Sequence, residues 1–122
     1  MKRIFYYTDV LPFLSKEDAA IDKLKHNLEL FGQNADRITL IWHPWSKTAE
    51  YLKLNGSPVL DEYIKIADDY KLGGWGVFDD SLSPEQSKRV LLSCNAYYGD
   101  ISNLMYDAME AGLPVMIQNL NI

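Results

Sequence analysis

The stretch RITLIW, residues 37–42, decides the fold class, because its near-continuous apolar character is typical of a parallel strand that is covered on both faces. Four further short apolar segments are predicted to be strands, and they lie at residues 4–8, 75–78, 94–98 and 113–117. Segments with helical spacing of apolar residues separate them, at residues 15–31, 57–72, 83–92 and 102–111. This alternation predicts a parallel sheet with helices on both faces.

Residues 1–122 are therefore expected to form one Rossmann-like α/β domain, a three-layer sandwich around a five-stranded parallel sheet of order 3-2-1-4-5. Ser15 and Ser57 are expected to cap the first two helices, and residues 43–56 between them to be irregular. Ser83 begins a capping-box sequence before the third helix. No closing helix is expected after the fifth strand, which suggests a partner chain or a larger protein.

The charge composition of the chain limits which classes of binding partner are expected. Seventeen acidic residues oppose twelve basic ones, for a net charge of −5, and the basic residues form no cluster. Because nucleic acids are bound mainly by clustered Lys and Arg, a nucleic-acid partner is not expected. A small anion is still compatible with the composition, since backbone N–H groups at a helix start hold anions without net positive charge.

No apolar run approaches the roughly 18 residues of a membrane span, and the N-terminal apolar stretch is too short for a signal peptide. The one cysteine, Cys94, excludes an intramolecular disulfide and a multi-thiolate metal site. We therefore expect a cytoplasmic protein without a metal or bound cofactor.

For this strand order, ligands are expected where the loops at residues 8–14 and 98–103 meet. Gly99 permits a sharp turn or a close approach to a ligand, and Asp100 or Ser102 can cap the following helix. The first free N–H groups of that helix then suit a phosphate or a sugar hydroxyl. The same sequence is also compatible with a plain turn followed by a helix cap.

Four motifs occur in order along the chain: LIWHPWS at 40–46, GGWGVFDD at 73–80, AYYGDISNL at 96–104 and GLPVMIQN at 112–119. Together they resemble the C-terminal part of CDP-glycerol glycerophosphotransferases. The resemblance implies the donor-binding half of a GT-B transferase, which faces an N-terminal domain across a cleft. Such enzymes transfer glycerol phosphate from CDP-glycerol to a hydroxyl of a growing cell wall polymer. The nucleotide-linked donor would be this chain's small-molecule partner.

The resemblance and the loop geometry together predict the site residues. The expected donor or phosphate contacts are His43, Gly99, Asp100, Ser102 and Asn103. The expected base or sugar contacts are Thr8, Trp45 and Tyr98. His43 and Asp100 are also the candidates for a catalytic role.

The chain departs from the family pattern at two positions of the first motif. His43 stands where the family has arginine, and Trp45 stands where it has histidine. Arginine grips phosphate bidentately at any physiological pH, and histidine does not. An incomplete or weakened transferase is therefore expected, and the residues leave open whether the chain is itself an enzyme.

Several of these residues have a plainer interpretation. His43 could be a surface histidine before a proline bend. Asp79 and Asp80 could bind a metal, but the pair favours a turn before Ser81. Trp75 is expected to begin a central strand in the core, and Cys94 to be an inert buried thiol.

Two other functions are compatible with the sequence. A noncatalytic interaction module would self-associate or dock on a partner domain through an exposed apolar face. A receiver-like signalling domain would use Asp9 and Asp79 after the first and third strands. A receiver also needs a lysine after the fifth strand, where this chain has Gln118.

Overall fold

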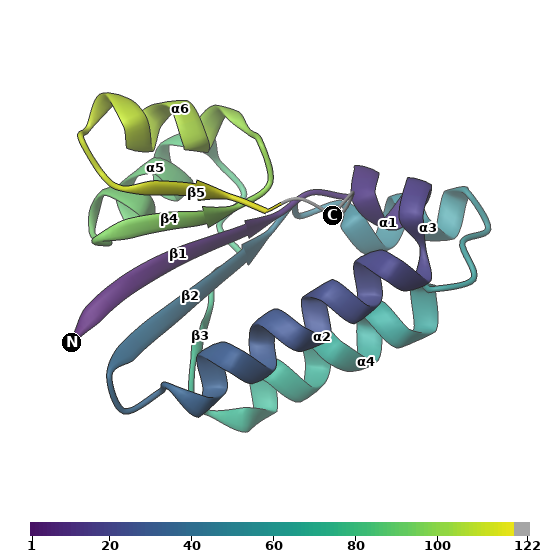
Figure 1. Cartoon of the computed structure of the whole chain (residues 1–122). Coiled ribbons are helices and arrows are strands. Elements are labelled where there is room, and N and C mark those ends of the chain that lie inside the picture. Colours follow the sequence, from purple (N-terminus) through teal and green to yellow (C-terminus); the bar gives the residue numbers. More distant parts are fainter. Residues whose placement is uncertain (119–122) are drawn as a thin grey trace.

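Five parallel strands form one sheet in the order β3-β2-β1-β4-β5 in the computed structural model, which describes residues 1–118 (Figure 1). The strands are β1 (Lys2–Thr8), β2 (Ile38–Pro44), β3 (Val77–Phe78), β4 (Ala96–Gly99) and β5 (Val115–Ile117). Their ends differ from the predicted ones by at most two residues. The Rossmann-like fold class and the strand order 3-2-1-4-5 are confirmed. The expectation about a closing helix concerns residues 119–122, which lie outside the described residues.

Helices cover both faces of the sheet, as Figure 1 shows. The helices α2 (Asp18–Gln33) and α4 (Leu60–Gly73) lie on one face, and α5 (Pro84–Leu92) and α6 (Asn103–Glu110) lie on the other. Two short helices, α1 (Leu11–Lys16) and α3 (Thr48–Leu54), lie near the carboxyl ends of β1 and β2. In the part of the chain that the structure describes, no helix has both the length and the apolar character that a membrane span needs.

The two central strands explain the continuous apolar pattern of residues 37–42. Tyr6 and Trp42 are fully buried in the core cluster beneath α2 and α4. Phe5 and Ile41, their neighbours along the chain, are fully buried in the second cluster, beneath α5 and α6. Since successive side chains of a strand point to opposite faces, both faces of β1 and β2 need apolar residues.

The prediction of one helix from Ser15 to residue 31 is wrong. The chain forms α1 and then α2, and Glu17 separates them with a positive φ of 43°. Pro12 in the first turn starts α1 early, because proline suits the first helical positions. Ser15 therefore lies inside α1, and its Oγ donates to the carbonyl of Leu11 at 2.9 Å instead of capping α2.

Residues 43–56 are not irregular throughout, because α3 forms within them. Leu52 anchors α3 with a fully buried side chain, and Thr48 Oγ1 donates to the carbonyl of Trp45 at 2.6 Å. The predicted cap at Ser57 is also wrong. The helix α4 begins three residues later, at Leu60, and Ser57 Oγ accepts from the N–H of Val59 at 3.3 Å.

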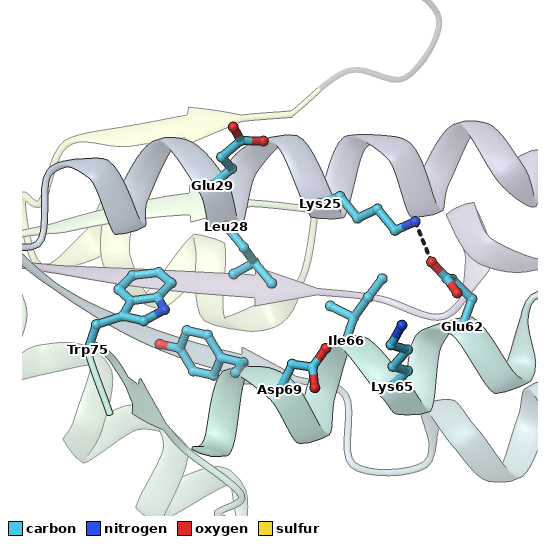
Figure 2. Close-up of a pocket in the computed structure, with 9 residues that line it drawn as sticks. Lys25, Leu28, Glu29, Glu62, Lys65, Ile66, Asp69 and Trp75 are labelled. Carbon is cyan, nitrogen blue, oxygen red and sulfur yellow. Dashed lines mark ion pairs between the residues drawn. The ribbon is translucent and has the colours of Figure 1, made fainter. Parts of the chain in front are cut away.

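Trp75 does not begin a central strand, because β3 starts at Val77 and lies at the sheet edge. Its ring meets Tyr70 edge-on, with centroids 5.1 Å apart. Both residues line a surface groove of about 390 Å³ between α2 and α4 (Figure 2). An ion pair between Lys25 and Glu62 links the two helices along the same groove.

The backbone conformation at Gly99 indicates that a larger residue there would lower the stability of the fold. A Cβ at this position would lie 2.0 Å from the carbonyl oxygen of Tyr7, and the φ of 141° is unfavourable for any other residue. Gly99→Ala should therefore lower the free energy of unfolding by about 3 kcal/mol or more, measured by chemical denaturation.

Gly112→Ala is the matched control, because Gly112 also has a positive φ, 77°, but a Cβ there would meet nothing within 4 Å. It should cost only about 1–2 kcal/mol. Equal losses in the two variants would contradict the importance of the contact with Tyr7.

Candidate functional site

A cavity of about 340 Å³ opens at the carboxyl ends of β1 and β2, between the starts of α5 and α6. We call it the anion cavity, after the ligand class that the sequence predicts for this corner of the sheet. Its lining combines hydroxyl, imidazole and helix-terminal groups, and consists of Tyr7, His43, Trp45, Ser46, Ser81, Leu82, Pro84, Ser87, Ser102, Asn103, Leu104 and Asp107. The strand order places this cavity beside the predicted switch point between β1 and β4.

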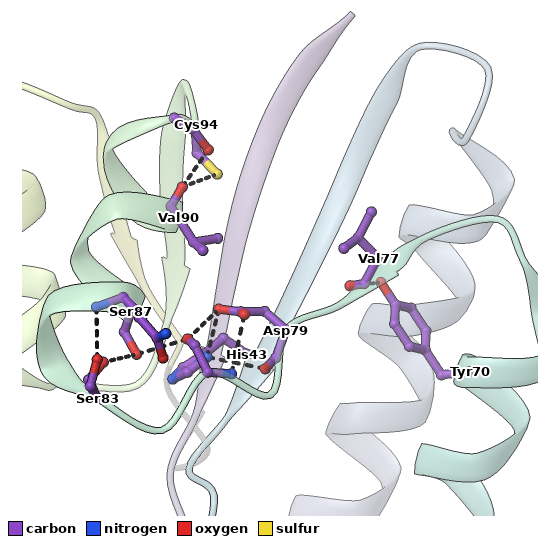
Figure 3. Close-up of polar contacts among 11 residues, drawn as sticks. His43, Tyr70, Val77, Asp79, Ser83, Ser87, Val90 and Cys94 are labelled. Carbon is purple, nitrogen blue, oxygen red and sulfur yellow. Dashed lines mark hydrogen bonds and ion pairs between the residues drawn. The ribbon is translucent and has the colours of Figure 1, made fainter.

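His43 is the most constrained polar side chain of the anion cavity. It is only 5% exposed, and its ring stacks on Phe5 and Tyr7 at centroid distances of 5.4 and 6.0 Å. Its Nδ1 lies 2.9 Å from Asp79 Oδ2 and 3.1 Å from the Asp79 carbonyl oxygen (Figure 3). His43 lines the cavity, and no hydrogen bond of its other ring nitrogen, Nε2, is found among residues 1–118.

Asp79 was expected to be a turn residue, and it does form the turn. Its Oδ1 accepts from the N–H of Ser81 at 3.2 Å. Its Oδ2 accepts from Ser81 Oγ at 3.0 Å and also faces His43. The contact with His43 was missed, because the sequence does not show that the loop after β3 folds toward β2. The only signal was the acidic pair itself at a strand end.

Two helix starts converge on the anion cavity. Ser83 Oγ caps α5 by accepting from the N–H of Gln86 at 3.1 Å, as the sequence predicts. Ser102 Oγ caps α6 by accepting from the N–H of Met105 at 3.1 Å. At the start of α6 the N–H groups of Asn103 and Leu104 have no partner within the helix, and both residues line the cavity together with the Asp107 carboxylate. The start of α5 offers less, because Pro84 has no N–H and the N–H of Gln86 is bonded to Ser83.

Gly99 and Asp100 are absent from the lining of the anion cavity. Gly99 approaches the backbone of Tyr7 and not an open site. The Asp100 carboxylate accepts from the N–H of Asp9 at 2.7 Å and from Gln118 Nε2 at 2.6 Å. Burial raises the pKa of the Asp100 carboxyl, and these two hydrogen bonds act in the opposite direction. The turn therefore joins β1, β4 and β5, and its carboxylate is occupied by the protein's own donors.

The three predicted base or sugar contacts lie in different places. Thr8 is 1% exposed, and its Oγ1 accepts from Trp42 Nε1 at 3.0 Å. Tyr98 lies on the opposite face of the sheet, in the cluster beneath α2. Trp45 does line the anion cavity and meets Tyr51 edge-on at 4.7 Å. Of the predicted site residues, the structure thus brings together His43, Trp45, Ser102 and Asn103.

A second cavity of about 370 Å³ continues from the first along the side of α4. We call it the adjoining cavity. The two share Trp45, Ser46 and Leu82, and the adjoining cavity extends to Lys71 and Tyr63.

Cys94 is buried, as predicted, and its Sγ donates to the carbonyl of Val90 at 3.3 Å (Figure 3). Burial is the main cause that raises the pKa of this thiol, which keeps it in the unreactive form. Among residues 1–118, no three His, Cys, Asp or Glu side chains gather into a group that could hold a metal ion.

No protein-family model, curated protein or solved structure matches the chain. Two of the four sequence motifs contribute residues to the lining of the anion cavity: His43, Trp45 and Ser46 come from the first, while Ser102, Asn103 and Leu104 come from the third. The second motif contributes Asp79, which is not part of the lining but contacts Nδ1 of His43.

Thr8 tests the distinction between a structural and a ligand-binding residue. Thr8→Val keeps the shape of the side chain but leaves the buried Trp42 Nε1–H without an acceptor. We expect a loss of about 1–3 kcal/mol in the free energy of unfolding. Ligand affinity, measured under conditions where the variant is folded, should stay unchanged. A selective loss of ligand binding with intact stability would contradict this assignment.

Proposed function

We propose that the chain is the donor-binding domain of a glycerophosphotransferase-like protein and binds a nucleotide-linked donor of the CDP-glycerol type. One observation carries the proposal: His43 and the first residues of α6, Asn103 and Leu104, line one cavity. Helix starts favour anions through their free N–H groups and their dipoles. The diphosphate of the donor is the anionic group that matches this arrangement.

The size and shape of the site support a ligand longer than a diphosphate. The adjoining cavity meets the anion cavity at Trp45, whose indole offers an apolar surface to a base or sugar. The proposal therefore places the phosphates near His43 and the nucleoside beyond Trp45.

The proposal covers the donor side of a transfer reaction. His43 remains the candidate for a catalytic or phosphate contact, because Asp100 is occupied by internal hydrogen bonds. Transfer also requires an acceptor hydroxyl held opposite the donor, a role that the proposal gives to a second domain. Under this proposal the protein acts in cell wall polymer synthesis, at the cytoplasmic side. We expect the 122-residue chain by itself to bind donor without measurable transfer.

Ligand-dependent thermal unfolding tests the proposal. CDP-glycerol, CDP or CMP at 100 times its dissociation constant should stabilise the fold by about 2.7 kcal/mol. For a domain of this size, the midpoint of unfolding should rise by roughly 10 °C. His43→Gln should remove most of this rise, whereas the control His26→Gln changes an exposed histidine of α2 and should leave it intact.

No shift with millimolar concentrations of any of these nucleotides would contradict donor binding. An equal loss in both histidine variants would show that the ligand binds somewhere other than the anion cavity. Measured glycerophosphate transfer by the isolated chain would contradict the division of roles between two domains.

A second candidate function, a noncatalytic interaction module, is favoured by one apolar surface. A trough of about 490 Å³ lies between α2 and the β4–β5 part of the sheet, on the face away from α5 and α6. We call it the apolar trough. Its lining is mostly aliphatic and aromatic: Ile4, Asn27, Leu30, Phe31, Asn34, Ala96, Tyr97, Tyr98, Pro114, Val115 and Met116.

Self-association through the apolar trough would be lost in Met116→Lys, since Met116 is 67% exposed within it. Met109→Lys is the control, because Met109 is 56% exposed on α6, outside the trough. Sedimentation velocity at increasing concentration measures the effect. A wild-type chain that stays monomeric at high concentration would contradict self-association.

The receiver-like alternative is not proposed. Receiver domains have the strand order 2-1-3-4-5, whereas this sheet has the order 3-2-1-4-5. Asp79, the expected partner of Asp9 in that alternative, instead contacts His43 and Ser81.

A further inference from the structure

The contact between Asp79 and His43 fixes which ring nitrogen carries hydrogen. Nδ1 of His43 faces two oxygen atoms of Asp79, the carboxylate Oδ2 and the backbone carbonyl. Both oxygens are acceptors when the carboxylate is ionised, so Nδ1 must be the donor. In the neutral ring, Nε2 then carries the lone pair and is the ring nitrogen that Asp79 does not occupy.

We propose that Asp79 is a positioning residue that acts through His43. It holds hydrogen on Nδ1 and fixes the ring plane, so that Nε2 is presented to the ligand. When His43 is protonated, its Nε2–H donates to a phosphate oxygen while the carboxylate balances the buried charge. The ligand part of this inference rests on the proposed function, whereas the state of the ring rests on the geometry alone.

Hydrogen bonds from neighbouring residues hold the Asp79 carboxylate in its position beside His43. The Asp79 carboxylate receives hydrogen bonds from the N–H and the Oγ of Ser81. Ser81 Oγ lies 3.0 Å from Ser87 Oγ, and Ser87 donates in turn to the carbonyl of Ser83 at the start of α5. A turn needs only the bond to the Ser81 N–H. The additional bonds orient Oδ2 toward the ring of His43 (Figure 3).

The substitution Asp79→Asn distinguishes two roles of Asp79. If the residue acts only through its negative charge, pyrophosphate affinity should rise, and if it positions His43, the affinity should fall. Asp79→Asn removes a negative charge close to an anion cavity, so charge alone would tighten the binding of inorganic pyrophosphate. Positioning predicts instead that pyrophosphate and CDP bind at least tenfold more weakly, as measured by calorimetry. Asp80→Asn is the matched control for pyrophosphate, because Asp80 carries the same charge next along the chain but is exposed, and the hydrogen bonds to His43 Nδ1 come from Asp79. Asp80 lines the adjoining cavity, so this control is read with pyrophosphate and not with CDP. It should change pyrophosphate affinity less than twofold, or tighten it.

The ring itself provides a readout that needs no ligand. Nitrogen-15 NMR of the His43 side chain should show hydrogen on Nδ1 in the neutral wild-type ring. Asp79→Asn should move part of the population to the other tautomer, and Asp80→Asn should not. Hydrogen on Nε2 in the wild type, or an unchanged tautomer in Asp79→Asn, would overturn the inference. If the tautomer changes but the wild type binds no pyrophosphate, the proposed function fails and the role of Asp79 toward the ring stands.

Two further variants separate this role from a loss of folding. Ser81→Ala removes one hydrogen bond to Asp79 Oδ2 and should weaken pyrophosphate binding two- to threefold, in the same direction as Asp79→Asn. If Asp79 acts through His43, the double variant His43→Gln, Asp79→Asn should bind no more weakly than His43→Gln alone. Additive losses of affinity in the double variant would overturn the inference. Tighter pyrophosphate binding by Asp79→Asn or by Ser81→Ala would also overturn it, provided that the thermal unfolding of that variant remains cooperative.

Discussion

The close approach of β4 to β1 at Gly99 is the constraint on which the rest of the site depends. The peptide after Gly99 donates from the Asp100 N–H to the Tyr7 carbonyl oxygen at 3.1 Å, at a point where any Cβ on residue 99 would overlap that oxygen. The same turn directs the Asp100 carboxylate to the N–H of Asp9 and to Gln118. Three strand ends are thereby fixed together, and α6 starts from this fixed corner.

This corner and His43 belong to one row across the sheet. Tyr7 is in register with His43 of β2 on one side and with Gly99 of β4 on the other. The position of α6 relative to His43 therefore follows from backbone pairing, not from flexible loops. Asp79 adds the loop after β3 to the same arrangement through its bonds to His43. A ligand in the anion cavity would meet groups whose positions are set before it binds.

The sequence was sufficient for the sheet and for part of the site. Apolar patterning predicts the strands, because burial on both faces leaves few alternatives for β1 and β2. The order 3-2-1-4-5 was expected for a doubly wound sheet, and the structure confirms it. Local patterns were less reliable for the ends of helices. Ser15 resembled a helix cap, but α1 begins before it, with Pro12 in its first turn. The same limit applies to Gly99 and explains the missed contact of Asp79. Glycine in a turn indicates a close approach, but the sequence does not show whether the approaching group is a ligand or another strand.

The environment of His43 suits an imidazole, and under the proposed function this residue stands where glycerophosphotransferases have arginine. The side chain is nearly buried, stacks on Phe5 and Tyr7, and contacts the Asp79 carboxylate through Nδ1. An arginine there would be a larger group in a nearly buried position, and its charge would be paired by the Asp79 carboxylate. Under the proposed function, in a chain of net charge −5, local groups such as this ring and the start of α6 would supply the attraction for phosphate.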